Sequence, residues 1–232
     1  MGDRAFKELL YGQFARLGKA LASPARLELL DLLAQGERTV EALAHEAGLS
    51  VANASSHLQT LARARLVSSR KSGLHVRYRL ADPSVYHLWA ALRDTGTAQL
   101  AEIDRLADTY LHDRRALEPI SREELLSRLG DGATVVLDVR PALEYQQGHV
   151  AGARSIPVDE LEARLGDLDP ARDVVAYCRG PYCVFADEAV SLLRAKGMRA
   201  YRYAEGFPEW AAAGLPVAVE GAAESGAPST TR

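Results

Sequence analysis

Apolar residues recur at helical spacing through the first quarter of the chain. The stretch 5–21 places leucines and phenylalanines three or four residues apart, which predicts an amphipathic helix. Ser23, followed by proline, is a typical helix start and Gly36 a typical helix end, so a second helix is predicted between them. Short helices are predicted at 39–47 and 50–64, and the tight turn that joins them indicates a helix-turn-helix.

The pattern changes to strict alternation of apolar and polar residues at 66–80. The turn residues at 71–73 separate two halves of this stretch, which predicts a β-hairpin. Asp82, followed by proline, begins a long helix that is predicted to run to about Arg114.

The second half of the chain alternates between short apolar runs and helical patterns. The runs at 134–138 and 173–177 are bounded by turn residues and predict buried strands. Helical patterns lie at 121–129, 159–165, 183–196 and 207–213. Such alternation predicts an α/β domain with a parallel sheet.

A change of character between these halves marks a domain boundary. Pro119 interrupts the helical pattern, and a capping motif at Ser121 starts a new one. We therefore expect two domains: a mainly α, winged helix-turn-helix domain at 1–115 and an α/β domain at 120–218. Residues 219–232 are rich in Gly, Ala, Ser and Thr, which predicts a disordered tail.

Charge is unevenly distributed along the 232 residues, although the formal net charge is only −3. No acidic residue lies between Glu46 and Asp82. The basic residues in that interval are Arg63, Arg65, Arg70, Lys71, Arg77 and Arg79. A basic segment in a mildly acidic chain indicates a phosphate-binding surface. The sequence shows neither a signal peptide nor an apolar run that could span a membrane, so we expect a cytoplasmic protein without membrane contact.

Two surfaces of the N-terminal domain are candidates for DNA contact. The helix at 50–64 carries small and amide side chains that suit a major groove. Its candidate residues are Asn53, Ser55, Ser56, Gln59 and, at the base of the helix, His57. The hairpin would lie along the phosphates. Its candidates are Arg70, Lys71, His75, Arg77 and Arg79, all expected on one exposed face. A solvated helix beside a solvated hairpin accounts for the spacing equally well.

The order of these motifs resembles the ArsR/SmtB family of winged-helix repressors over roughly residues 5–113. The matching residues are Pro24, Arg26, Leu30, Ser55, His57, Leu58, Leu61, Gly73 and Tyr78. The resemblance implies a homodimer formed by the apolar faces of 5–20 and 84–112. Such a dimer would bind pseudo-palindromic operator DNA and release it when an inducer binds.

Metal-sensing members of that family hold their ions with cysteines in the third helix or with Asp/His sets on the last helix. The predicted third helix here has no cysteine. Asp104, Asp108 and His112 share one face of the predicted last helix, which would allow a zinc site. A solvated polar face is the simpler explanation, so we expect no metal site and no sensor within this domain.

The two cysteines of the chain, Cys178 and Cys183, lie five residues apart. In a reducing compartment such a pair is more often reactive or metal-binding than a structural disulfide. Cys178 ends a predicted strand, before a loop and a helix N-terminus whose backbone N–H groups favour a thiolate and can cradle a persulfide. We therefore expect Cys178 to attack sulfane sulfur, with a buried strand-end cysteine as the plain alternative.

The surrounding residues resemble the rhodanese family over about residues 120–217. The match comprises Leu137 to Pro157, Gly206 to Trp210 and Gly214 to Val217. The resemblance implies that Cys178 bears a persulfide inside a cradle loop. The loop residues are Arg179, Gly180, Pro181, Tyr182 and Cys183. It also implies mainly structural roles for Asp138, Arg140, Glu144 and His149. Arg140 would face the active-site mouth or form an ion pair with Glu144.

The last loop position, Cys183, departs from the related pattern. A loop of six residues is typical of sulfurtransferases, but the final position is often an arginine or a small polar residue. A thiol there weakens anion binding and places a second sulfur at a helix N-terminus, where its pKa should fall. Two interpretations stay open: Cys183 resolves a Cys178 persulfide into a disulfide or short polysulfide bridge, or it is a small apolar residue that starts the helix.

These features predict a DNA-binding repressor whose rhodanese domain senses or transfers sulfane sulfur through Cys178. One alternative is a sulfurtransferase with an accessory DNA-binding domain. Another is a repressor that responds to arsenite or another thiophilic metal, although two thiolates are few for a closed metal site. We expect weak sulfurtransferase activity and no cofactor. The expected partners are double-stranded operator DNA, a second copy of the chain, and a donor such as thiosulfate, persulfide or polysulfide.

Overall fold

The computed structural model describes residues 4–111, 117, 119–132 and 134–220. These residues form two compact units that divide between Ile103 and Asp104. Each unit has a hydrophobic core of its own.

Three helices of the N-terminal unit begin at polar caps that the sequence predicts, whereas the predicted cap Ser23 makes no side-chain hydrogen bond to its helix. Thr39 Oγ1 accepts a hydrogen bond from the Ala42 N–H (3.2 Å) and Ser50 Oγ accepts one from the Asn53 N–H (3.2 Å). Each cap satisfies a first-turn donor that has no partner within its helix. The helices are α1 (Arg4–Leu21), α2 (Pro24–Ala34), α3 (Val40–Glu46), α4 (Val51–Arg63) and α5 (Pro83–Gln99).

The core of this unit lies between α2, α3, α4 and a small sheet. Leu30, Leu43 and Leu58 are buried in one cluster, to which the sheet contributes Val67 and Tyr78. The antiparallel strands have the order β1-β3-β2. Their bounds are β1 (Arg38–Thr39), β2 (Val67–Ser72) and β3 (His75–Leu80). This arrangement confirms the winged helix-turn-helix.

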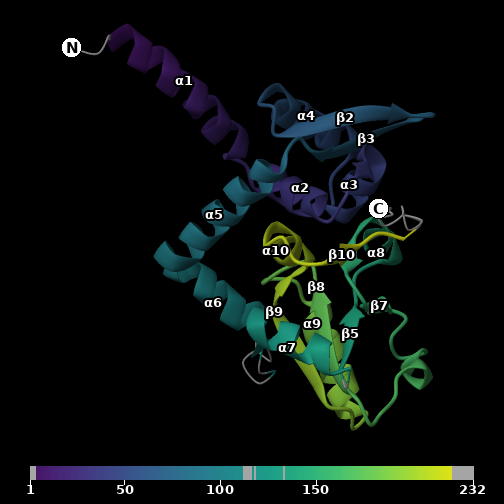
Figure 1. Ribbon diagram of the computed structural model, residues 1–232. Helices are drawn as coiled ribbons and strands as arrows, with labels where there is room; N and C mark the ends of the chain where they lie inside the picture. Colours follow the sequence, from purple (N-terminus) through teal and green to yellow (C-terminus); the bar gives the residue numbers. More distant parts are fainter. Residues whose placement is uncertain (1–3, 112–116, 118, 133, 221–232) are drawn as a thin grey trace, which may run out of the picture. The chain divides into compact units, whose positions relative to one another are not determined.

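The single long helix predicted after Asp82 is wrong. α5 stops before Leu100, whose backbone is extended (φ −112°, ψ 95°), and α6 (Ala101–Tyr110) follows as a separate helix (Figure 1). A Cβ added to Gly96 would lie only 3.2 Å from Ile103 Cδ1. The missing side chain at Gly96 therefore lets Ile103 close over the end of α5.

A five-stranded parallel sheet organises the C-terminal unit, with the strand order β4-β9-β8-β5-β7. The prediction of a parallel sheet is thus confirmed. The bounds are β4 (Pro119–Ile120), β5 (Thr134–Asp138), β7 (Arg154–Ser155), β8 (Asp173–Cys178) and β9 (Ala200–Gly206). A separate antiparallel pair is formed by β6 (His149–Val150) and β10 (Val217–Ala218). The β8–β9 register shifts between Ala176 and Cys178, and beyond the shift Cys178 pairs with Gly206.

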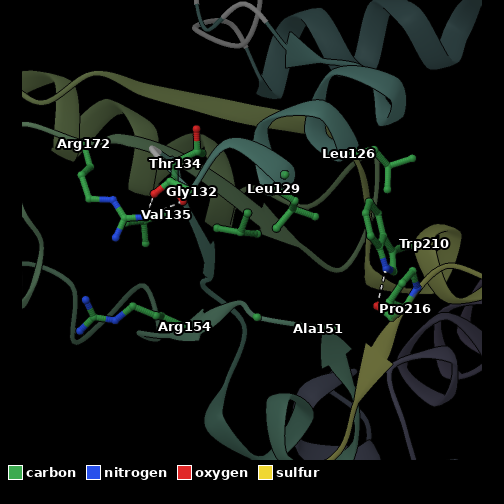
Figure 2. A pocket seen from close by; sticks show the side chains of 13 residues that line it. Leu126, Leu129, Gly132, Thr134, Val135, Ala151, Arg154, Arg172, Trp210 and Pro216 are labelled. Atoms are coloured by element: carbon green, nitrogen blue, oxygen red, sulfur yellow. Dashed lines mark hydrogen bonds between the residues drawn. The ribbon is translucent and has the colours of Figure 1, made fainter.

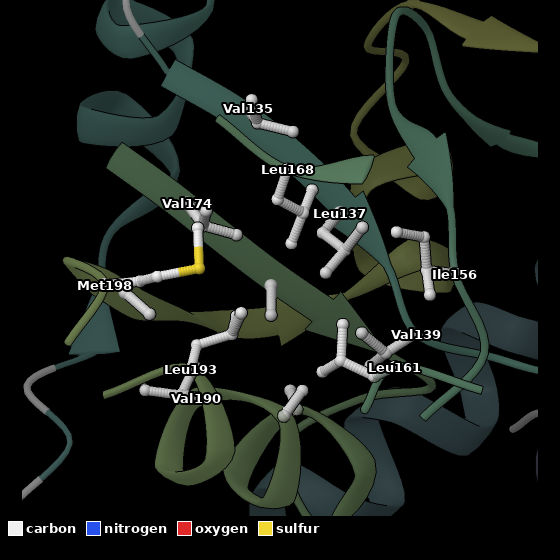
Figure 3. Packing of buried hydrophobic residues seen from close by; sticks show 14 of the residues in the cluster. Val135, Leu137, Val139, Ile156, Leu161, Leu168, Val174, Val190, Leu193 and Met198 are labelled. Atoms are coloured by element: carbon white, nitrogen blue, oxygen red, sulfur yellow. The ribbon is translucent and has the colours of Figure 1, made fainter. Parts of the chain in front are cut away.

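Helices cover both faces of this sheet. On one face, Val174 of β8 and Leu137 of β5 pack with Val190 and Leu193 of α9 (Figure 3). On the other face, Tyr177 of β8 shares a cluster with residues of α7 and α10. The bounds are α7 (Arg122–Asp131), α8 (Ala142–Gln147), α9 (Phe185–Ala195) and α10 (Phe207–Ala212). Because side chains alternate along a strand, Cys178 lies on the α9 face.

The helix predicted at 159–165 is wrong. This stretch is a series of turns that ends in a short 3₁₀ helix, Leu165–Asp167. Leu161 and Leu168 are buried against the sheet. Their spacing therefore reflects a loop lying across the core and not a helical face.

The C-terminal tail and membrane contact are the two last features that the sequence addresses. Most of the predicted tail, residues 221–232, lies outside the described residues, whereas the Glu220 N–H donates to the Gln146 carbonyl (3.1 Å). Among the described residues, no helix combines the length and apolar character needed to cross a membrane.

Candidate functional site

Cys178 stands where β8 ends and the cradle loop, Arg179–Cys183, begins. Only 1 % of the residue is exposed. Its Sγ lies 3.7 Å from the carbonyl oxygen of Cys183 and 4.0 Å from that of Gly180, so the S–H can donate to both. The structure therefore places both sulfur-bearing residues around one short loop.

The end of β9 presses on the backbone of this loop. A Cβ built on Gly206 would lie 2.3 Å from Gly180 N and 2.6 Å from the Cys178 carbonyl oxygen. No side chain fits there, so glycine is what lets β9 approach the loop this closely. Sequence reasoning placed Gly206 in a closing motif without a role at the site, because a backbone contact leaves no pattern of polar or apolar positions.

The two thiols hold their protons differently. Burial raises the pKa of Cys178 well above the ordinary thiol value, and its interaction with Cys183 adds to this rise. The hydrogen bond from Cys178 lowers the pKa of Cys183, helped by the backbone N–H groups of Arg179 and Phe185. The lowered pKa of Cys183 was expected. The sequence favours a thiolate on Cys178, but desolvation of its sulfur outweighs the N–H groups that point at it and acts against that form.

A buried carboxylate fixes the first residue of the cradle loop. Arg179 Nε donates to Glu144 Oε1 (2.8 Å), and Arg179 Nη2 makes a second, shorter contact with the same oxygen. Glu144 is only 1 % exposed. The guanidinium also lies 5.4 Å from the centroid of the Phe185 ring. The loop is thus held at its start by an ion pair and along its backbone by β9.

Arg140 lies in the interior, which corrects the expectation that it faces the active-site mouth. Its Nη2 donates to Asp138 Oδ2 (2.6 Å) and to the Gly148 carbonyl (2.8 Å), and its guanidinium lies 4.4 Å from the Phe207 ring centroid. The residue is fully buried. Asp138, two residues earlier at the end of β5, provides the ion pair that was expected from Glu144.

The structural role expected for His149 agrees with its contacts. Its ring stacks on Tyr145 with centroids 3.6 Å apart, and its Nδ1 lies 2.8 Å from the Tyr145 carbonyl oxygen. These contacts tie the end of α8 to β6, away from the cysteines.

The candidate DNA-reading side chains gather on one side of α4. Asn53, Ser56 and Gln59 are exposed, whereas Ser55 and His57 are partly buried. Within the helix, Gln59 Nε2 donates to Ser55 Oγ (3.4 Å). These side chains are available for contact with a partner, and the opposite side of the helix enters the core.

The β2–β3 hairpin is called the wing here, and three of its basic side chains already face carboxylates, whereas Arg79 donates to Ser68 Oγ (3.3 Å). Arg70 donates to both oxygens of Glu37 (2.6 and 2.8 Å), and Arg77 lies 3.9 Å from the same carboxylate. The hydrogen bond from Arg70 lowers the pKa of Glu37 and keeps it anionic. His75 Nδ1 lies 3.6 Å from Glu41. Sequence reasoning missed Glu37 and Glu41 because they come from before the basic segment.

Lys71 does not share the face expected for it. In the β2–β3 register Arg70 pairs with Arg77, whereas Lys71 pairs with Val76. Directly paired residues lie on the same face and neighbours along a strand lie on opposite faces. Lys71 is exposed, but on the opposite face from Arg70, Arg77 and His75.

A hollow of about 540 Å³ lies between α7, β5 and α10 (Figure 2). Leu126, Leu129 and Trp210 line one part, and Arg154 and Arg172 lie at the other. Arg172 donates to the carbonyls of residues 132 and 134 (2.7 and 2.9 Å), so its charge partly serves the backbone. No residue of the cradle loop lines this hollow, which separates it from the cysteine chemistry.

The described residues contain no cluster of three or more metal-ligating side chains. Asp104 and Asp108 lie on α6 as expected. His112, the third member of the zinc site that we considered, lies outside the described residues, so that site is not tested.

Large apolar side chains are exposed along α1. Phe6, Leu9, Tyr11 and Phe14 each have more than half of their surface open to solvent. Two further exposed leucines, Leu88 and Leu92, lie on α5. We call these residues on α1 and α5 the apolar stripe. Exposed apolar side chains in such number are typical of an interface.

Two family models match the chain. The model of bacterial regulatory proteins of the arsR family matches residues 23–69, and the model of the rhodanese-like domain matches residues 121–213. Together they cover the helix-turn-helix and the parallel sheet.

Individual proteins extend these matches. The HTH-type transcriptional regulator Rv0324 of Mycobacterium tuberculosis is 44% identical over 216 residues, which cover 93% of this chain and 95% of that protein. A sulfurtransferase of Allochromatium vinosum is 35% identical over 100 residues, covering 42% of this chain and 92% of that protein. The homodimeric winged helix-turn-helix domain of Mycobacterium bovis Mb0332 is 44% identical, covers 43% of this chain and 91% of that one, and has a TM-score of 0.40.

Proposed function

The chain belongs to the arsR family of bacterial transcriptional regulators and carries a rhodanese-like domain, and we propose that sulfane sulfur bound at Cys178 controls its binding to DNA. The observation that supports this is the pair of cysteines around one rigid loop at the end of a parallel strand. Backbone N–H groups there contact both sulfurs. Such groups stabilise a negatively charged sulfur, which a persulfide is at neutral pH.

The signal state is a persulfide on Cys178. A sulfane sulfur atom is transferred from thiosulfate or a polysulfide, and sulfite or the shortened polysulfide leaves with the electron pair of the broken S–S bond. Cys183 then attacks the inner sulfur of this persulfide and releases HS⁻. The two thiols are oxidised to a disulfide, and the sulfane sulfur is reduced to sulfide. The reducing cytoplasm would reset the pair.

The N-terminal unit supplies the DNA contacts. The exposed residues Asn53, Ser56 and Gln59 of α4 suit base edges in a major groove. Arg79, on the same face of the wing as Arg70 and Arg77, suits phosphates. A homodimer formed through the apolar stripe would place two copies of α4 on a pseudo-palindromic operator, as the geometry of two-fold dimers requires.

Binding to the DNA upstream of the protein's own gene tests this function. Fluorescence anisotropy with the full chain should show salt-sensitive binding that weakens at least tenfold (~1.4 kcal/mol) after treatment with sodium tetrasulfide. Cys178→Ser should bind DNA and lose this response. Absence of salt-sensitive binding would contradict the regulator, and an intact response in Cys178→Ser would contradict sensing through Cys178.

Intact mass tests the bridge between the cysteines. After treatment with sodium tetrasulfide and rapid alkylation, the wild type should show a species with both thiols blocked by an intramolecular link. Cys183→Ser should retain the added sulfur and form no link. Equal added mass in both proteins, with a link in neither, would contradict resolution by Cys183.

A sulfurtransferase is the second candidate function, favoured by the likeness of the C-terminal unit to the Allochromatium vinosum sulfurtransferase. In that case the DNA-binding unit would only localise or regulate the enzyme. Thiosulfate:cyanide turnover would then depend on Cys178 while DNA binding would be indifferent to sulfur donors. The two functions separate in Cys178→Ser, which loses turnover under both and loses the DNA response only under the first.

A further inference from the structure

Access to the two sulfurs of the cradle loop is unequal. Cys178 is 1 % exposed and packs in the core cluster with α9, whereas Cys183 is only partly buried. The residues on either side of Cys183, Tyr182 and Val184, are exposed. A small donor arriving from solvent therefore meets Cys183 first.

The loop cannot easily turn Cys178 outward. Gly206 packs against the Cys178 carbonyl and the Gly180 N–H so closely that not even a methyl group would fit between them. Arg179, the next residue, is anchored by the buried Glu144. Exposing Cys178 would require β9 and this ion pair to move together.

The two sulfurs also differ in how readily they lose their protons, and the more accessible one loses its proton more readily. The Cys178 Sγ lies within 4.0 Å of the carbonyl oxygens of Gly180 and Cys183, which are acceptors for a protonated thiol. Backbone N–H groups of Gly180 and Ala186 also point at this sulfur, but its burial outweighs them. The more exposed Cys183 sulfur accepts hydrogen bonds from the backbone N–H groups of Arg179 and Phe185. The thiolate is the nucleophile toward sulfane sulfur, so the accessible sulfur is also the one arranged as a thiolate.

We propose that Cys183 is the first acceptor of sulfane sulfur and that it passes the sulfur inward to Cys178. This relay deepens the proposed function, on which it rests, by adding a second catalytic residue and assigning the order of the two transfers. It also defines the donor class: small, anionic sulfane-sulfur compounds such as hydropolysulfide and thiosulfate, which reach a partly exposed thiolate without displacing the loop.

Each transfer balances without a further reagent. In the first, the Cys183 thiolate attacks the terminal sulfur of the donor; a new S–S bond forms, the donor S–S bond breaks, and the shortened polysulfide or sulfite leaves. In the second, Cys178 attacks the outer sulfur of the Cys183 persulfide, and the Cys178 proton moves to the leaving Cys183 thiolate. The products are a Cys178 persulfide anion and a Cys183 thiol. One sulfane sulfur atom changes position, and no net oxidation occurs.

The relay is tested by following the sulfur in time. The wild-type full chain is mixed with sodium tetrasulfide, quenched by alkylation at short intervals, and mapped by peptide mass spectrometry. The added sulfur should appear on Cys183 first and on Cys178 later. Sulfur on Cys178 at the earliest times, with none on Cys183, would overturn the relay.

Two variants test the order independently. Cys178→Ser keeps a hydrogen-bond donor beside Cys183 and should hold one added sulfur on Cys183 that goes no further. Cys183→Ser should load Cys178 about tenfold more slowly or worse, because only a buried, protonated thiol remains. Val184→Ala, an exposed neighbour outside the cradle loop, should load like the wild type, and thermal unfolding of each variant checks that it is folded.

The outcomes separate the relay from the proposed function. Fast loading of Cys178 in Cys183→Ser overturns the relay and leaves sensing intact if tetrasulfide still weakens DNA binding. Ordered loading of Cys183 and then Cys178, with DNA binding unchanged by tetrasulfide, supports the relay and contradicts the regulatory role.

Discussion

The wing and the cradle loop both hold arginines against carboxylates, but the two regions differ in burial. Arg70 of the wing is well exposed and its partner Glu37 is partly exposed, whereas Glu144 and the pair Arg140–Asp138 are almost fully buried. Exposed pairs are weak and exchange readily for other anions. Buried pairs are costly to break because the remaining charge stays without water. The same chemistry therefore gives an exchangeable surface in one unit and a fixed frame in the other.

The sharpest way to break this comparison is to remove a buried carboxylate. Asp138→Ala leaves Arg140 buried without its main counter-charge and removes the acceptor of the Tyr177 hydroxyl (2.5 Å). We expect a loss of about 3–5 kcal/mol in the free energy of unfolding, measured by urea denaturation of the full chain. Asp167→Ala, which removes an exposed partner of Arg164, is the matched control and should change stability little. Equal effects of the two substitutions would contradict the role of burial.

A smaller effect is expected where one partner can reach solvent. Glu144→Gln keeps the shape of the side chain but removes its charge, and Arg179 retains 18% of its side-chain surface exposed. The stability should fall by about 1–3 kcal/mol, less than for Asp138→Ala. Because Arg179 begins the cradle loop, loading of Cys183 by tetrasulfide should also slow. A stable variant with unchanged loading would show that the ion pair does not position the loop.

Burial also separates the two thiols, and alkylation against pH measures this. The pKa of Cys183 is lowered and that of Cys178 is raised, so Cys183 should react with iodoacetamide below the pH at which an ordinary thiol does. Cys178 should stay unreactive until higher pH. Near neutral pH we expect Cys183 to react about tenfold faster than Cys178, because a larger fraction of it is thiolate. Peptide mass spectrometry follows the alkylation of each cysteine. Equal rates for the two thiols at every pH would contradict the difference in their pKa values.

The raised pKa of Cys178 makes the free energy of unfolding depend on pH. The folded state holds this proton more tightly than the unfolded state does, so the stabilisation is complete below the ordinary thiol pKa and is lost as the pH rises through the folded value. The lowered pKa of Cys183 acts in the opposite direction. Stability in Cys183→Ser should therefore fall more steeply at alkaline pH than in Cys178→Ser, as thermal unfolding would show.

The smallest effect is expected in the exposed wing. Glu37→Gln releases Arg70 and Arg77 from an anion that competes with phosphate. DNA affinity should rise by about two- to tenfold at low salt, with a steeper salt dependence by about one ion. Unfolding should change little, since the ion pair is exposed. Weaker DNA binding in this variant would mean that Glu37 positions the wing for DNA instead of competing with it.

The sequence predicts the elements of this fold better than their partners. Caps at Thr39 and Ser50 and the apolar strands at 134–138 and 173–177 are local patterns, and the structure confirms them. The break at Leu100 was missed because leucine is a good helix former and only the contact of Ile103 with Gly96 reveals the close turn. The turns at 159–165 were misread because a loop that buries Leu161 against the core also has spaced apolar residues.

The candidate site shows the same limit. The positions of Cys178 and the cradle loop were predicted from the sequence. The lowered pKa of Cys183 was predicted as well, but the raised pKa of Cys178 was not. Desolvation of Cys178 depends on how residues of β5 and α9 pack around it and on the close approach of β9, none of which a local pattern shows. The ion pair of Arg140 with Asp138 and the carboxylates that face the wing likewise depend on three-dimensional packing. The spacing of residues along the chain does not show such contacts.

The close approach of β9 to the cradle loop also restricts how the chain can vary. At position 206 every residue other than glycine places a carbon inside the backbone of the loop. A substitution at position 206 would therefore disturb both the packing of β9 and the sulfur site, so its effect on folding cannot be separated from its effect on function. In a library of random variants, position 206 should accept no substitution at all, whichever of the two properties is selected.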